Sequence, residues 1–240
     1  MDASWEEFGW ERLGNGIGRR RLPVWDATVT LVAGADSVLL HDTGSTLREG
    51  AEVRAQAEAL LGRRVTHIAL SHPHFDHVLG TAAFAGAEVY GAVGTAELLG
   101  RGADALRADA VQHGMSERDA TAAADALVAP RHQVSGEWTL DLGGGLQVLL
   151  ANVGPGHTGH DLAVLVPGSP VVVLCGDLVE ESGEPQAGRD AVPSHWPAAL
   201  DRLLELGGED ALYVPGHGAV VDAAFVRAQR DRLAARFCVS

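Results

Sequence analysis

The sequence predicts an α/β fold, and three observations lead to this class. Apolar runs rich in β-branched residues, typical of buried strands, alternate with longer stretches of helical character. Several of these runs end in a histidine or an aspartate at a tight turn, which is where α/β proteins commonly place their sites. The chain has 240 residues, 46% of them hydrophobic, so it is long enough for a substantial core in one large domain or two small ones.

The first half of the chain is predicted to contain four strands and one helix. Gly34-Ala35-Asp36 is expected to form the turn between the first two strands, and Gly62 to end the helix. A loop rich in histidine follows the third strand. The predicted elements are, in order, strands near 27–33 and 37–42, a helix near 49–61, a strand near 65–70 and a short strand at 88–90.

The middle of the chain is predicted to be helical. A helix near 94–99 is expected to end at Gly100, and residues 103–127 form a predicted helical insertion rich in alanine and charged residues. Ser116 is a candidate start for a second helix within it. Because the insertion has few large apolar residues, we expect it to bury little core and to lie beside the site as a lid. A homodimer surface or a segment without a role would fit the same composition.

The second half is predicted to return to strands and to close with two helices. Asp222 is expected to cap the last helix, which runs to about Arg236. The predicted elements are strands near 137–142, 146–152, 162–166 and 171–175, a helix near 197–206, a strand near 211–214 and the closing helix.

The run Ser71–His77 carries three imidazoles and a carboxylate within seven residues. Imidazole and carboxylate together suit zinc, iron or manganese. His72 and His74 are two residues apart in an extended segment, so both side chains point the same way. The candidate ligands in this run are His72, His74, Asp76 and His77.

Three later residues sit in a similar context and extend the ligand set. His157 lies in a glycine-rich turn, Asp177 follows the apolar run Val171–Leu174, and His217 follows Val214-Pro215-Gly216. Seven candidate ligands are too many for one zinc, which takes about four, and suit two ions that share a carboxylate.

In this order the motifs resemble the metallo-β-lactamase superfamily of metal-dependent hydrolases, over residues from about 29 to about 221. The resemblance implies a single domain over 1–240, built as a four-layer αββα sandwich of two mixed β-sheets flanked by helices. It also implies the ligand assignment: His72, His74 and His157 at the first metal, Asp76, His77 and His217 at the second, and Asp177 bridging both.

Asp42 is a further candidate at the end of a predicted strand. It suits the turn before Thr43-Gly44, and its carboxylate could also orient a ligand imidazole from behind. His160, three residues after His157, is either a proton shuttle at the rim of the site or a turn residue, and the sequence leaves both roles open.

These observations predict a dinuclear zinc-dependent hydrolase, with iron or manganese as alternative metals. A metal-bridged hydroxide would attack a small ester, lactone, thioester or β-lactam-type substrate, with Asp76 orienting the nucleophile. The alternative is a mononuclear non-haem iron oxidoreductase resembling the persulfide dioxygenases. A site that binds metal without activity is a third hypothesis, which the complete ligand set disfavours.

Composition limits the partners. The formal net charge of −14 argues against nucleic-acid or anionic-membrane binding, so the expected partner is a small-molecule substrate. The one dense basic run, Arg19-Arg20-Arg21, is predicted to be a solvated loop. The acidic N-terminus lacks the apolar core of a signal peptide, and no apolar run reaches the roughly 20 residues of a membrane span. Two cysteines imply no disulfide framework, so a cytoplasmic location is expected, while the oligomeric state is left open, with a homodimer as one option.

Overall fold

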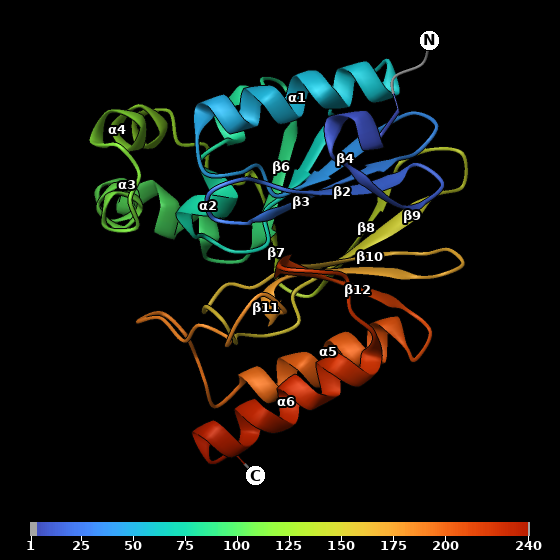
Figure 1. The fold of residues 1–240 in the computed structure, drawn as a ribbon, viewed down its shortest axis with the longest axis vertical. Coiled ribbons are helices and arrows are strands. Elements are labelled where there is room, and N and C mark those ends of the chain that lie inside the picture. The colour runs from blue at the N-terminus through green and yellow to red at the C-terminus, as the bar shows by residue number, and fades with distance from the viewer. Residues whose placement is uncertain (1–3, 240) are drawn as a thin grey trace.

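Two β-sheets pack face to face, and helices cover their outer faces (Figure 1). The structure is a computed structural model that describes residues 4–239, so residues 1–3 of the acidic N-terminal segment lie outside the described part. In Figure 1, α1 (Leu47–Leu61) covers the upper sheet, and α5 (Trp196–Gly207) and α6 (Ala223–Phe237) cover the lower one. The predicted αββα sandwich of two mixed sheets is therefore confirmed.

The first sheet has seven strands in chain order. Its first four strands pair antiparallel, whereas β4 to β7 pair parallel, which makes the sheet mixed. Its strands are β1 (Glu11–Gly14), β2 (Ile17–Arg21), β3 (Thr28–Ala33), β4 (Val38–His41), β5 (His67–Ala69), β6 (Glu88–Ala92) and β7 (His132–Val134).

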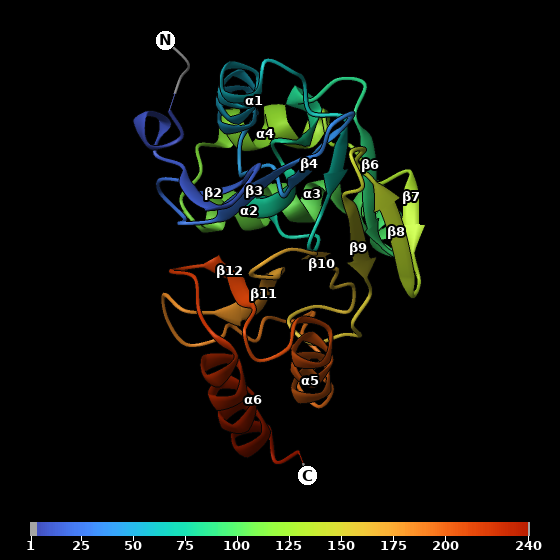
Figure 2. The same ribbon diagram turned by 90° about the vertical axis from the view of Figure 1, so that its right-hand side faces the viewer.

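The second sheet has five strands in the order β12-β11-β10-β9-β8. β11 and β12 pair parallel, and the other neighbours pair antiparallel. Figure 2 shows β7 and β8 side by side, where the edges of the two sheets meet. The strands are β8 (Glu137–Asp141), β9 (Gln147–Ala151), β10 (Ala163–Val166), β11 (Val172–Glu180) and β12 (Leu212–His217).

Apolar side chains fill the space between the sheets. Val32 and Leu39 of the first sheet and Leu150, Val164 and Leu174 of the second belong to one fully buried cluster. The central strands β3, β4 and β11 are buried along nearly their whole length, so both of their faces are covered. This packing holds the strand ends, and the loops that follow them, in fixed positions.

The helical middle differs from the prediction at two points. α3 (Thr95–Gln112) continues through Gly100, where a helix end was expected. Gly100 faces solvent and its φ is helical, so it lowers the helix propensity without ending the helix. The expectation that residues 103–127 bury little core was also wrong, because this segment places five residues in the core under α1. These are Leu106, Ala110, Met115, Ala120 and Ala123.

Two further helices and two short 3₁₀ turns complete the fold. Ser116 caps α4 by accepting from the backbone of Asp119, and Asp222 caps α6 by accepting from Phe225, as predicted. The remaining elements are α2 (Phe75–Val78), α4 (Glu117–Asp125), η1 (Glu6–Phe8) and η2 (Thr81–Ala83).

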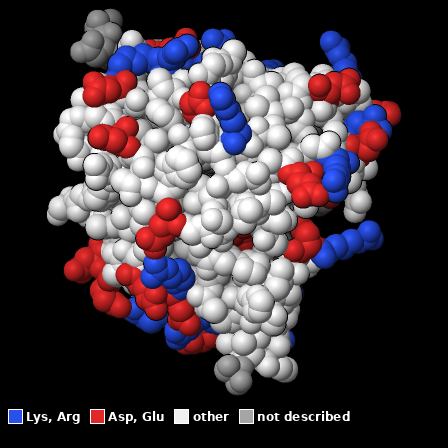
Figure 3. Space-filling view, turned by 180° about the vertical axis from the view of Figure 1, so that it is seen from behind, with Lys and Arg blue, Asp and Glu red and all other residues white. Residues whose placement is uncertain are grey.

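The prediction that the arginine triplet forms a solvated loop was wrong. The three residues lie in β2. Arg19 is buried, and its guanidinium binds the Glu11 carboxylate on β1 and the Gly218 carbonyl, 2.7 Å from Nη1. A buried arginine needs such partners, and one of them, the Gly218 carbonyl, is distant in sequence and cannot be recognised from the local pattern. On the face shown in Figure 3, arginine side chains likewise lie close to aspartate and glutamate side chains.

No helix in the described part of the chain is long and apolar enough to cross a membrane.

Candidate metal centre

All seven predicted ligands meet at one end of the two sheets. His72 and His74 lie on the loop after β5, Asp76 and His77 on the short helix α2, and His157 on the loop after β9. The other two, Asp177 and His217, come from β11 and the end of β12. Their ligand atoms form two groups, one of His72, His74, His157 and Asp177, the other of Asp76, His77 and His217.

The first group surrounds Oδ2 of Asp177. This oxygen lies 3.6 Å from Nε2 of His72 and 3.3 Å from Nε2 of His157. Nδ1 of His74 lies 3.0 Å from Nε2 of His157. Three imidazole nitrogens and one carboxylate oxygen therefore converge, which is the donor set of a catalytic zinc site.

Two histidines of the second group contact the same carboxylate. Nε2 of His77 lies 3.2 Å from Oδ1 of Asp177, and Nε2 of His217 lies 3.4 Å from Oδ2 of Asp177. His217 is also 3.4 Å from Oδ2 of Asp76. Asp177 thus contacts members of both groups, as the bridging assignment requires.

Asp42 orients one imidazole of each group. His77 donates its Nδ1–H to Oδ2 of Asp42 at 2.9 Å. Ser71 donates its hydroxyl to the same oxygen at 2.7 Å, and its Oγ lies 2.8 Å from Nδ1 of His72. Because the Ser71 hydroxyl proton points to Asp42, its oxygen accepts the Nδ1–H of His72. Both imidazoles therefore turn Nε2, the nitrogen left for a metal, toward the centre.

The other three imidazoles are oriented by loops that follow distant strands. His157 donates Nδ1–H to the Gln186 carbonyl at 3.0 Å, and His217 donates to the Trp25 carbonyl at 2.9 Å. His74 donates Nε2–H to Asp190 at 2.9 Å, so it presents Nδ1 instead. Each ligand histidine thus has one nitrogen fixed from behind and one facing the cluster, the pattern expected of metal ligands.

Buried atoms without partners test whether the residues fit a metal. Among the described side chains, Nε2 of His72, Nε2 of His77 and Oδ1 of Asp177 are buried with no hydrogen-bond partner. Such orphaned groups are costly in a folded protein unless something else satisfies them. A divalent cation between them would do so, and nitrogen and carboxylate donors suit it.

The electrostatics of the metal-free cluster point the same way. Burial, reinforced by the neighbouring histidines, outweighs the attraction of Asp177; it lowers the pKa of His72 well below its ordinary value and that of His157 to about 4. Burial also lowers the pKa of His217, but attraction and hydrogen bonding from Asp177 and Asp76 outweigh it and raise the pKa to about 11. Burial raises the pKa of Asp177, yet the surrounding histidines lower it well below the usual range. The buried carboxylates of the cluster thus favour positive charge beside them, which a metal ion would supply.

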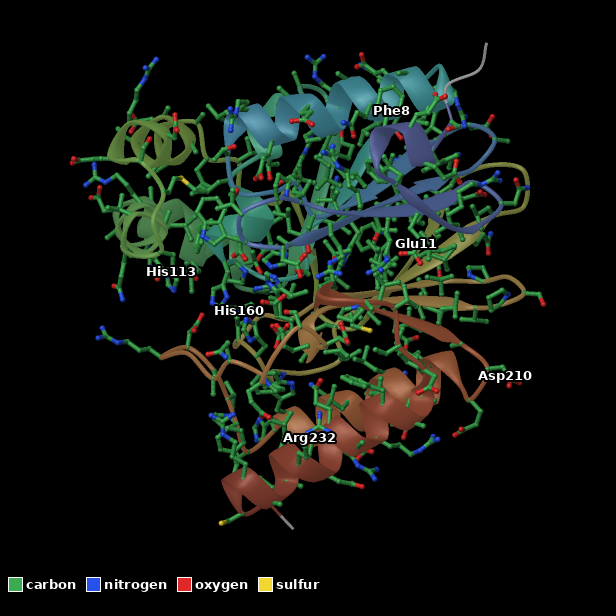
Figure 4. The ribbon with its side chains drawn as sticks, in the orientation of Figure 1. Phe8, Glu11, His113, His160, Asp210 and Arg232 are labelled. Atoms are coloured by element: carbon green, nitrogen blue, oxygen red, sulfur yellow. The ribbon has the colours of Figure 1, made fainter. Side chains whose placement is uncertain are left out.

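His160 was proposed as catalytic, but the structure keeps it outside both ligand groups. Its Nδ1 donates to the Val93 carbonyl at 2.8 Å, and its ring packs against Gly94. It lines an open pocket with residues from the first half of α3, and in the view of Figure 4 it lies on the same side of the molecule as His113. His113 lies at the C-terminal end of α3, and its ring stacks on Phe75 at 5.5 Å between centroids.

The sequence analysis missed three side chains of the site. Ser71 was noted only as the start of the histidine run. Asp190 lies on the long loop between β11 and α5, far in sequence from its partner His74, and no local pattern marks it. Glu180, the last residue of β11, has a carboxylate oxygen within 4.8 Å of ligand atoms of Asp177 and His217. The signal in the sequence that could have identified Glu180 is its position three residues after Asp177.

Comparison with known proteins agrees with this geometry. The family model described as "Metallo-beta-lactamase superfamily" matches residues 22–217 of the sequence. The chain belongs to this superfamily. It is 28% identical over 195 residues to "Metallo-beta-lactamase domain-containing protein 1" from Xenopus laevis, covering 80% of this chain and 71% of that one.

Solved metallo-β-lactamases share the fold of this superfamily member at low sequence identity. FIM-1 from Pseudomonas aeruginosa, in its mono-zinc form, superposes with a TM-score of 0.70 at 20% identity, over 96% of each chain. The enzyme from Pontibacter korlensis gives a TM-score of 0.72 at 20% identity, over 92% of this chain and 98% of that one. With its fold and its histidine and aspartate cluster, the chain has the framework of a metal-dependent hydrolase.

Proposed function

We propose that this protein is a dinuclear zinc hydrolase that acts on a small ester, lactone, thioester or β-lactam-type substrate. The observation that carries the proposal is the position of Asp177 between two complete ligand groups, with its Oδ1 and Oδ2 directed at different histidines. His72, His74 and His157 would hold one ion, and Asp76, His77 and His217 the other. A single ion would leave several of these buried donors unsatisfied.

Bound zinc would polarise the scissile carbonyl and lower the pKa of a water molecule to near neutrality. The protein's own residues would orient the ligands and the attacking water. Asp42, directly and through Ser71, keeps the Nδ1 protons of His77 and His72 away from the centre. Asp76 stays ionised, because its histidine neighbours outweigh the effect of burial and lower its pKa. Its carboxylate is therefore able to accept a hydrogen bond from the attacking water and to orient it.

A nucleophile from the protein is not needed for this chemistry. Cys175 is buried in β11, and burial raises the pKa of its thiol well above the ordinary value, so it stays protonated. Ser71 is buried, and its hydroxyl is engaged by Asp42 and His72. An activated water is therefore the nucleophile that the site supports best.

Elemental analysis after native purification, combined with a panel of lactone, thioester, ester and β-lactam substrates, tests the proposal. We expect two zinc ions per chain and turnover of at least one class. One iron and no zinc would favour the mononuclear iron oxidoreductase instead. Absence of bound metal under metal-replete conditions would overturn both.

A further inference from the structure

Glu180 is a buried carboxylate beside the metal centre that the proposed reaction does not use. Its residue is 7% exposed, and it ends β11 opposite His217 in the register of β12. One of its oxygens lies within 4.8 Å of ligand atoms of both His217 and Asp177. It is not grouped with Asp76 or His77, so it lies to one side of the second ligand group.

Hydrogen bonds fix one oxygen of this carboxylate and the backbone of Glu180. Its Oε1 accepts from the hydroxyl of Ser182 at 2.5 Å and from the Ser182 amide at 3.2 Å. The Glu180 amide donates to Gln229 of α6 at 3.0 Å, and Gln229 is fully buried and donates to the Leu178 carbonyl. These contacts leave Oε2 without a hydrogen bond to any other described residue, and so free for a ligand.

Two arginines in the neighbourhood, Arg19 and Arg21, are already engaged by other partners. The chain contains no lysine, so its 18 basic residues are all arginine. Arg19 approaches the site through Gly218, but its guanidinium is bound to that carbonyl and to Glu11. Arg21 is paired with Asp26 through two hydrogen bonds. Arg189 is exposed on the loop after β11, beside Asp190.

We infer that Glu180 makes the centre select substrates with a positively charged or hydrogen-bond-donating group close to the reacting atom, and reject those with a carboxylate there. This rests on the proposed function. A substrate carboxylate on the Glu180 side of the second ligand group would meet a buried like charge, so repulsion and desolvation would offset part of its attraction to bound zinc. An ammonium, amide or hydroxyl group would instead satisfy the free Oε2.

Small thiols probe this selection without requiring the natural substrate. Thiolates bind zinc, and a related metallo-β-lactamase from Erythrobacter litoralis has been solved with beta mercaptoethanol in its active site. 2-Aminoethanethiol, 2-mercaptoethanol and mercaptoacetate place an ammonium, a hydroxyl or a carboxylate next to the same kind of anchor. Their Kd values for the zinc-loaded protein, measured by calorimetry, compare the three charges at one site.

We expect 2-aminoethanethiol to bind the wild-type protein about tenfold more tightly than mercaptoacetate, after both are normalised to 2-mercaptoethanol. The preference should weaken as salt is added. Glu180→Gln keeps the side-chain shape and the Ser182 contacts, so it should reduce the preference to about twofold while zinc content and Tm stay close to wild type. Glu184→Gln is the matched control, because Glu184 is exposed on the loop that follows β11, and it should keep the preference.

Other results would overturn the inference. Equal binding of the charged thiols by the wild-type protein would do so, even if Glu180→Gln failed to fold. Tighter binding of mercaptoacetate that is lost in Arg189→Gln would assign an anion site to Arg189 instead. Failure of the protein to bind zinc would remove the proposed function itself, which separates the two outcomes.

Discussion

Asp42 accepts the Nδ1–H of His77 at 2.9 Å, and the same oxygen accepts from Ser71, which in turn fixes His72. One carboxylate therefore orients one ligand of each metal position. Asp42 adopts a left-handed backbone conformation, with φ of 59°, which places its side chain below both imidazoles. Its other oxygen accepts from the Ser71 amide at 2.8 Å, so the carboxylate is fixed on both sides.

Replacing Asp42 by Asn should weaken both metal positions. An amide has one neutral oxygen and an NH2 group that cannot accept, so Asn cannot replace both Asp42 oxygens and the imidazoles lose their orientation. We expect a loss of about 10–100-fold in zinc affinity. Competition with a chromophoric chelator measures the two dissociation constants.

Ser71→Ala is the matched control for this variant, because it removes only the link to His72. It should weaken the first metal position and leave the second near its wild-type affinity. Unchanged zinc affinity in Asp42→Asn would show that the orientation of the imidazoles does not depend on this carboxylate.

Asp177→Asn should lower the metal content and largely abolish turnover while the fold persists. The amide offers one neutral oxygen in place of two charged ones, so it cannot serve both ligand groups. We expect at most one tightly bound zinc per chain by elemental analysis, with an unchanged far-ultraviolet circular dichroism spectrum. His113→Ala, at the end of α3, should keep both ions. Two zinc ions and a normal rate in Asp177→Asn would refute the bridging assignment.

The cluster of ligands from His72 to His77 could be predicted from the sequence because its density is recognisable by itself. His157, Asp177 and His217 were found with the help of the superfamily pattern, and the predicted strand ends before Asp177 and His217 are wrong, because β11 and β12 continue through these residues. The superfamily resemblance then supplied the sandwich, since periodicity alone indicated only an α/β fold. Helix caps such as Asp222 were likewise local, and the structure bears them out.

The rest depended on contacts between distant segments. Asp190 meets His74 across 116 positions of sequence, and Arg19 meets Gly218 across 199. Nothing near these residues in the chain marks the partner, so the arginine run resembled a solvated loop. The helix end predicted at Gly100 was wrong for a different reason. Tertiary packing of α3 overrides the modest loss of helix propensity at this glycine.

Asp190→Ala should selectively weaken the first metal position. The loop between β11 and α5 supplies the outer partner of two first-group ligands, the Asp190 carboxylate for His74 and the Gln186 carbonyl for His157. Without Asp190, His74 is free to turn its Nδ1 away from the cluster. We expect about a tenfold loss of zinc affinity at one position. Faster tryptic cleavage at Arg189 should accompany it, because the loop loses one of its anchors.

Asp190→Asn should retain part of the affinity, since its amide oxygen can still accept from His74. Asp210→Ala is the remote control, because Asp210 is exposed on the far side of the molecule from His160 (Figure 4). Equal zinc affinity in Asp190→Ala and Asp210→Ala would show that the loop does not position His74.

Zinc binding should release protons at neutral and mildly alkaline pH. In the metal-free protein, the carboxylates of Asp177 and Asp76 raise the pKa of His217 to about 11, and burial does not offset this. His217 is therefore protonated at pH 8, and an incoming cation must displace that proton. Apparent zinc affinity should rise with pH up to this pKa. Since the folded pKa lies above the ordinary 6.5, protonated His217 also stabilises the metal-free fold fully below pH 6.5, and this contribution is lost as pH rises through about 11.

Calorimetry at pH 8 in buffers with different ionisation enthalpies measures the released protons directly. His217→Gln keeps a polar side chain but carries no titratable proton, so it should release fewer protons for each zinc bound at the remaining position. Its metal-free form should also show a weaker fall in the free energy of unfolding between pH 7 and pH 10 than the wild-type protein does. A heat of binding that does not change with the buffer would contradict the protonated state, and it would place His217 in the metal-free protein as a neutral imidazole already prepared for the ion.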